Sequence, residues 1–220
     1  MTTRLAEEKE SKAREGMKIM GLNDSTYYIS WFIFNLIIVT YISFWIVSIL
    51  QLETFWLSNA WLIFFICVLY GTQFYGFSFT IVGILPTKKA SATAASLLHI
   101  ATFYILYLYK GYGTSMLEKT LVSCFVPNVA LGFMLDHLLH VEVEGGVGLT
   151  FETAWLPYQS YNVIIGLCCQ LFCVVLWSFL GIYFDKIMPR EFGRNEPWNF
   201  ICKKSKKLNS FVDVGEEFHD

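Results

Sequence analysis

Four long segments without a charged residue constrain this chain more than any other feature of its sequence. They are residues 28–50, 60–85, 90–109 and 161–184, with lengths of 23, 26, 20 and 24 residues. An α-helix needs about 20 apolar residues to cross the roughly 30 Å hydrocarbon core of a bilayer. The sequence therefore predicts an all-α integral membrane protein with four transmembrane helices.

The composition agrees with a chain surrounded by lipid. Of the 220 residues, 55% are hydrophobic and 15% are charged, whereas soluble domains have about 45–50% apolar and about 25% charged residues. This composition excludes a water-soluble globule and a disordered, collagenous or coiled-coil chain. We expect the lipid bilayer to be a partner and expect no nucleic-acid partner.

The positions of the basic residues predict the orientation of the spans. Two lysines, Lys88 and Lys89, lie between the second and third spans, and seven basic residues follow Phe184. Five more precede the first span: Arg4, Lys9, Lys12, Arg14 and Lys18. Cytoplasmic loops are enriched in lysine and arginine, so we expect both termini in the cytoplasm and residues 110–160 outside or in a lumen. The pattern suits plasma and endolysosomal membranes equally.

The stretch between the third and fourth spans contains an apolar run that is divided by a proline. Pro127 splits it into halves of about ten residues, and Glu118 and Asp136 bracket it. Each half is too short to span a bilayer, so we expect a re-entrant external helical hairpin over residues 115–140. The alternative is a fifth spanning helix kinked at Pro127, which would invert the fourth span and put seven basic residues outside.

Residues 1–22 predict a short amphipathic helix on the cytoplasmic surface. Glu8–Lys12 and Glu10–Arg14 are spaced as i,i+4 pairs, and Gly21 is placed to end the helix. One side carries small or apolar residues at helical spacing: Ala6, Ala13, Met17 and Met20. Such a helix can lie on the membrane, or its mixed charges can bind a protein partner.

Several motifs resemble the A subfamily of ABC transporters, the large lipid exporters. The first is the pattern EKE…E.M..MGL, formed by Glu8, Lys9, Glu10, Glu15, Met17 and residues 20–22. Weaker matches follow in order at 123–132, at 145–148 with Phe151, and at 192–193 with 197–200. The chain departs from the family's pattern over residues 84–97, where small residues replace the family's glycines.

The resemblance implies that the chain is the permease part of one transporter half and a fragment of a longer protein. Residues 1–22 would be the coupling helix to an ATPase domain, and residues 185–220 a linker toward that nucleotide-binding domain. The residues expected to couple are Glu8, Glu10, Glu15, Met17, Met20 and Gly21. A second transmembrane half is implied as a partner, in the same chain or in trans, and the expected substrate is lipid or another hydrophobic molecule.

No phosphate-binding G-x-x-x-x-G-K-[ST] motif occurs in the sequence. We therefore expect the chain not to be an enzyme by itself, to bind no cofactor, and to rely on ATP and magnesium held by a nucleotide-binding domain. The alternative function is a stand-alone four-span scaffold or accessory subunit without transport activity.

Uncharged polar residues lie within the predicted spans: Asn35, Gln73, His99, Asn162 and Gln170. In a bilayer such side chains usually bond across helices, and the alternative is contact with substrate. The cysteines at 67, 168, 169 and 173 are expected to be small, inert core residues. His137 and His140 resemble a metal pair only superficially, since no further histidine is near.

Overall fold

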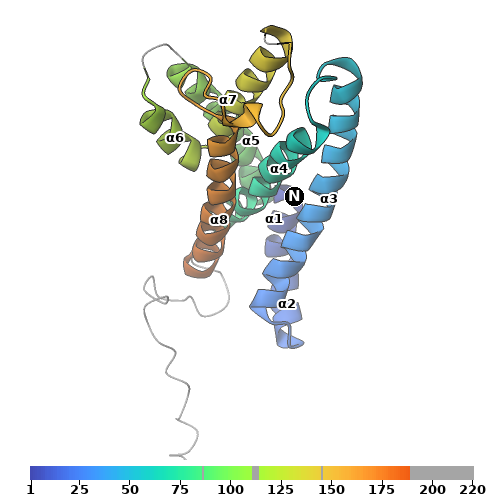
Figure 1. The fold of residues 1–220 in the computed structure, drawn as a ribbon. Helices are drawn as coiled ribbons and strands as arrows, with labels where there is room; N and C mark the ends of the chain where they lie inside the picture. Colours follow the sequence, from blue (N-terminus) through green and yellow to red (C-terminus); the bar gives the residue numbers. More distant parts are fainter. Residues whose placement is uncertain (86, 111–113, 145, 189–220) are drawn as a thin grey trace, which may run out of the picture. The chain divides into compact units, whose positions relative to one another are not determined.

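The computed structural model describes residues 1–85, 87–110, 114–144 and 146–188. Four helices in this part are long and apolar enough to cross a membrane: α3 (Asp24–Glu53), α4 (Ala60–Ile84), α5 (Lys88–Tyr109) and α8 (Val163–Ile187) (Figure 1). The prediction of four membrane-length helices is confirmed. No strand occurs within the described ranges, apart from an isolated bridge between Tyr158 and Tyr161.

The chain divides into two compact units, Met1–Asp185 and Lys186–Asp220. All of the described helices belong to the first unit except the last two residues of α8. The predicted linker at 185–220 and the motifs at 192–193 and 197–200 lie almost wholly outside the described residues.

The amino-terminal segment forms two helices, α1 (Thr2–Glu10) and α2 (Ala13–Ile19), where the sequence predicted one. The break is at Lys12, whose φ of 57° is left-handed and costs about 1–2 kcal/mol for a residue with a side chain. Packing offsets this cost, because the bend lets Leu5 of α1 and Arg14 of α2 both become buried. Gly21, with φ of 96°, ends the second helix as predicted.

The proline-divided stretch forms two short helices, α6 (Met116–Phe125) and α7 (Pro127–Leu139). Val126 between them is extended, and Pro127 takes the first position of α7, where its missing N–H costs nothing. Ser115 and Glu118 form a capping box that starts α6. A π-helical turn, η1 (His140–Glu144), and a 3-10 turn, η2 (Thr153–Trp155), follow.

Two apolar clusters hold the first unit together. The α7 cluster surrounds that helix, whose Val129, Ala130 and Met134 have no exposed surface, and it includes Ile63 of α4. The α1 cluster joins Leu5 and Ala6 of α1 to the beginning of α3 and the end of α4, where α1 lies beside α3 in Figure 1. Helix α4 therefore connects the two clusters.

Glycines allow α4 and α8 to approach closely. A Cβ atom on Gly76 would lie 2.3 Å from the backbone of Trp177 and Ser178, and one on Gly181 would lie 2.7 Å from Cβ of Phe79. Small residues permit such contacts between membrane helices. The close approach of α4 and α8 therefore depends on Gly76 and Gly181.

Candidate functional site

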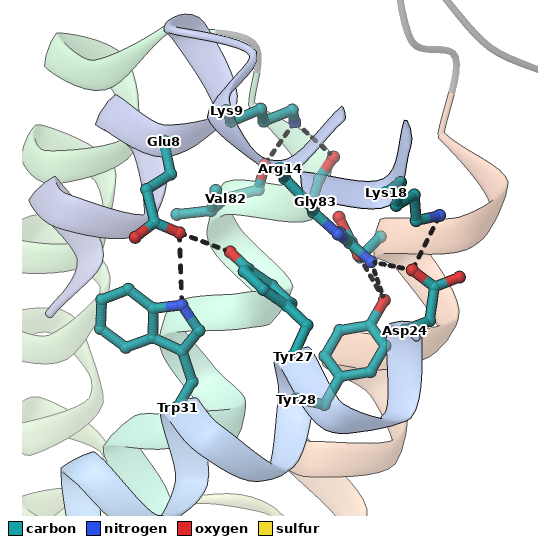
Figure 2. Close-up of polar contacts among 11 residues, drawn as sticks. Glu8, Lys9, Arg14, Lys18, Asp24, Tyr27, Tyr28, Trp31, Val82 and Gly83 are labelled. Atoms are coloured by element: carbon teal, nitrogen blue, oxygen red, sulfur yellow. Dashed lines mark hydrogen bonds and ion pairs between the residues drawn. The ribbon is translucent and has the colours of Figure 1, made fainter. Parts of the chain in front are cut away.

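Arg14 of α2 is the centre of a buried polar cluster at the ends of two spans. Its guanidinium pairs with the carboxylate of Asp185 near the end of α8, and donates to the hydroxyl of Tyr28 at 2.9 Å and to Asp24 at 3.2 Å. The ring centres of Tyr27 and Tyr28 lie 4.6 and 5.0 Å from its central carbon. Figure 2 shows Arg14 pointing toward the first turn of α3.

The electrostatics of the cluster keep Arg14 charged. Burial by itself lowers the pKa of Arg14, but the nearby carboxylate of Asp185 and the hydroxyl of Tyr28 outweigh it and hold that pKa above its usual range. The side chain is only 11% exposed, and a buried charge is tolerated only while it is paired. Arg14 therefore takes its partners from α3 and α8, and its side chain links α2 to both helices.

Glu8 joins α1 to the first turns of α3. Its Oε2 atom accepts hydrogen bonds from the Tyr27 hydroxyl at 2.8 Å and from the Trp31 indole at 3.3 Å (Figure 2). Both donors lie on the face of α3 that packs against α1.

Lys9 and Glu10 bind the ends of the next two spans. The Nζ atom of Lys9 donates to the carbonyl oxygens of Val82 and Gly83 at 2.5 and 3.2 Å (Figure 2), and to that of Leu85 at 3.1 Å. The carboxylate of Glu10 accepts a hydrogen bond from the backbone N–H of Lys88 at the start of α5. A cation at a helix C-terminus and an anion at an N-terminus both suit the helix dipole.

We call Glu8, Lys9, Glu10 and Arg14 the amino-terminal junction. Through it α1 and α2 contact the ends of all four membrane-length helices. Because these contacts are side-chain hydrogen bonds and ion pairs, a displacement of α1 and α2 relative to the four helices would break them.

The structure places the other predicted coupling residues in different settings. Glu15 is half-buried and makes no side-chain bond within the described residues, and Met17 is partly buried against the α1 cluster. Met20 is 81% exposed, so the continuous apolar side predicted for residues 6–20 is not formed. The sequence interpretation missed Lys9 and paired Arg14 with Glu10, because it assumed one straight helix. The signal for the partners of Arg14 was an acidic residue at the edge of two spans, Asp24 before the first and Asp185 after the fourth.

The predicted hairpin residues lie on α7. Asp136 accepts a hydrogen bond from the ammonium of Lys110 at 2.7 Å, which joins α7 to the end of α5. Pro127 lines a cavity of about 140 Å³ together with Gln73 and His99. The cavity lies where the break between α6 and α7 meets α4, α5 and α8.

A polar cluster beside this cavity holds His99. The side chain of Asn128, 1% exposed, donates to the His99 carbonyl oxygen at 3.0 Å and to Thr102 at 2.5 Å, and accepts from the Tyr70 hydroxyl at 2.6 Å. The Tyr70 hydroxyl is 3.4 Å from Nε2 of His99. These bonds fix α7 to α4 and α5.

The remaining polar residues differ in their settings. Gln73 bonds weakly across helices, with its Nε2 atom 3.4 Å from the carbonyl oxygen of Gln170. Asn35 is 7% exposed, and its amide nitrogen has no hydrogen-bond partner among the residues that the structure describes. Asn162 was expected inside the last span, but it precedes α8 and accepts a hydrogen bond from the Ile165 N–H at 3.0 Å, so it caps that helix.

Within the described ranges no group of three or more histidine, cysteine or acidic side chains is arranged to hold a metal ion. His140 instead lies 2.5 Å from a carboxylate oxygen of Glu144 and stacks on the ring of Tyr158, with ring centres 4.0 Å apart.

Comparisons with known proteins agree with the fold. The chain is 31% identical to "ABC transporter A family member 5" of Dictyostelium discoideum over 93% of its length. It is 25% identical to the retinal-specific phospholipid-transporting ATPase ABCA4 of Mus musculus over 90%, and 23% identical to the cholesterol transporter ABCA5 of Rattus norvegicus over 95%. The chain spans 12%, 9% and 13% of the lengths of these three relatives.

Residues 1–185 also match a family described as "ABC-2 family transporter protein". The match covers both amino-terminal helices, all four membrane-length helices and the α6–α7 pair. The chain is therefore a membrane domain of the ABC-2 transporter family, related to the A-subfamily ABC transporters.

Proposed function

We propose that this chain is the permease portion of an ATP-driven transporter that moves lipid or another hydrophobic substrate across a membrane. ATP and magnesium are held by a nucleotide-binding domain, which works with this chain and with a second transmembrane half, in the same polypeptide or in trans. The lipid class rests on the names of two relatives, a phospholipid-transporting ATPase and a cholesterol transporter, and on the apolar surfaces of α3 and α5.

In this proposal α1 and α2 form the coupling element on the cytoplasmic surface. The observation that carries it is the amino-terminal junction, which links two short charged helices to the ends of four spans. A push on α1–α2 from a moving ATPase domain would reach every span through side chains that are already bonded. The carboxylates of half-buried Glu15 and of exposed Glu7, which pairs with Lys88, would be offered to cations of a partner.

The same proposal places both termini in the cytoplasm and the α6–α7 hairpin in the external leaflet. Helices of 10 and 13 residues are too short to cross a bilayer, and irregular backbone at membrane depth must be shielded by protein. The burial of α7 among α4, α5 and the loop around Leu149 supplies that shielding.

The coupling role is tested by Glu15→Lys in the transporter assembled with its nucleotide-binding domains. Glu15 makes no side-chain bond within the described residues, so the substitution should leave thermal stability unchanged and reverse the charge offered to the ATPase domain. We expect substrate-stimulated ATP hydrolysis to fall several-fold while basal hydrolysis persists. Glu10→Lys is a poorer test, because Glu10 also binds the start of α5.

Glu53→Lys is the matched control, since Glu53 is exposed at the opposite end of α3. It should leave stimulated hydrolysis unchanged. Equal substrate-stimulated ATP hydrolysis in wild type and Glu15→Lys, with both proteins folded, would show that the Glu15 face of α2 has no coupling role.

A further inference from the structure

Two cysteine thiols from different helices meet beside the break in the hairpin. The Sγ atom of Cys124, on α6, lies 3.4 Å from the Sγ atom of Cys169, on α8, although 45 positions separate them in the sequence. A disulfide bond is about 2.05 Å long, so the two sulfur atoms need to approach by about 1.4 Å. Side-chain rotation supplies a displacement of that size.

The neighbouring thiols on α8, those of Cys168 and Cys173, are not in contact with another sulfur atom in the described residues. Cys173 directs its thiol to backbone oxygens, at 2.9 Å from the carbonyl of Cys124 and 3.4 Å from that of Ser123. Cys168 is exposed on another side of α8. Of the five described cysteines, Cys124 and Cys169 alone have their sulfur atoms in contact.

The two members of the pair differ in exposure. Cys169 is 3% exposed, whereas Cys124 is only partly buried. Thiols that are shielded from water react slowly, because the thiolate is the reactive form. Cys124 is therefore the thiol that an oxidant from the membrane surface reaches first, and Cys169 is held against it as the resolving partner.

We propose that Cys124 and Cys169 are a redox-sensitive pair that forms a disulfide on exposure to a peroxide. The Cys124 sulfur attacks one peroxide oxygen, giving a sulfenic acid and releasing water. The Cys169 sulfur then attacks the Cys124 sulfur, the S–O bond breaks, and a second water leaves with the thiol proton. Two electrons pass from the two thiols to the peroxide.

The bond would tie the end of α6 to α8. Helix α8 also carries Asp185, the partner of Arg14 in the amino-terminal junction, so an oxidised pair restrains the hairpin against the same helix that the junction engages. The external or lumenal side, where the proposed topology puts the hairpin, is also where disulfides persist. Formation of the bond itself depends on the geometry alone and not on the transport function.

The test is peptide mapping of the full chain in liposomes after treatment with hydrogen peroxide. Without reductant, we expect a peptide pair linked through Cys124 and Cys169, which disappears after reduction. Cys169→Ser should abolish that pair and leave Cys124 as a sulfenic acid that dimedone traps. The matched control Cys168→Ser should leave the yield unchanged, since Cys168 is adjacent in sequence but exposed elsewhere.

Two results would overturn the proposal. One is the absence of the Cys124–Cys169 peptide pair in a sample whose Cys168 has been oxidised, which shows that the peroxide was active. The other is a linked pair that persists in Cys169→Ser, which would assign Cys173 or Cys168 as the partner. Circular dichroism of each variant confirms that it is folded.

Discussion

The guanidinium of Arg14 on α2 pairs with the carboxylate of Asp185 on α8, although the two residues are 171 positions apart in the sequence. Tyr28 of α3 bonds to both, at 2.9 Å from Arg14 and 2.5 Å from Asp185. This pair joins the amino-terminal helices to the end of α8. The position of α1 and α2 therefore depends on the last membrane-length helix.

Replacing Arg14 by alanine should destabilise the folded protein. The substitution removes the guanidinium from Asp185, Tyr28 and Asp24 in a site that is largely closed to water, and breaking a buried ion pair costs about 3–5 kcal/mol. Thermal unfolding of the purified protein in detergent measures the effect. Arg4→Ala is the control, because Arg4 is exposed on α1; equal shifts for the two variants would contradict the buried pair.

Replacing Asn128 by alanine should loosen α7 from α4 and α5. The change removes the donor to the His99 carbonyl and the acceptor for Tyr70, and leaving buried polar groups unpaired costs about 1–3 kcal/mol each. Hydrogen exchange over residues 127–139 should rise, and the unfolding temperature should fall. Asn23→Ala should change neither, since the Asn23 side chain makes no capping bond in the described part of the chain.

Adding a methyl group at Gly76 should separate α4 from α8. The new Cβ would lie 2.3 Å from the backbone of α8, and overpacking of this kind costs about 1–3 kcal/mol. Gly16→Ala is the comparison, because no atom lies within 4 Å of a Cβ built there, and alanine favours a helix over glycine by about 0.5–1 kcal/mol. Unfolding of Gly76→Ala at the wild-type temperature would contradict the close contact between α4 and α8 at Gly76.

Cysteine labelling of a cysteine-free variant tests the topology of the hairpin. A membrane-impermeant maleimide added from outside should modify Leu156→Cys, which is 60% exposed in the wild type, and should spare Lys89→Cys until the membrane is permeabilised. A fifth spanning helix would put both positions on one side, so equal protection of the two cysteines would establish the kinked alternative.

The membrane-length helices could be predicted because span length and the absence of charge are local properties of the sequence. The turn at Pro127 was predictable for the same reason, since proline removes a backbone donor wherever it stands. The break at Lys12 could not be predicted. It exists because Leu5 and Arg14 reach separate partners on α3, α4 and α8, and those contacts are absent from the pattern of residues 1–22.

The sequence singled out Glu8 and Glu10 as coupling residues, but it did not predict the bonds that they make within the chain. Glu8 bonds to the first turns of α3 and Glu10 to the start of α5. The bonding of Lys9 to the end of α4 depends on where that helix stops relative to α1, which is a tertiary relationship. Cys124 and Cys169 likewise come together only through the packing of α6 on α8.

The most direct measurement of the central claim is the ratio of substrate moved to ATP hydrolysed by the assembled transporter carrying Lys9→Met. Methionine keeps the length of the side chain but removes the cation that holds the carbonyl groups at the end of α4, and Arg4→Met is the control on the exposed side of α1. If the junction transmits movement, ATP hydrolysis continues in Lys9→Met while the ratio falls several-fold below that of the control. An unchanged ratio in a folded Lys9→Met protein would show that the spans are driven by another route.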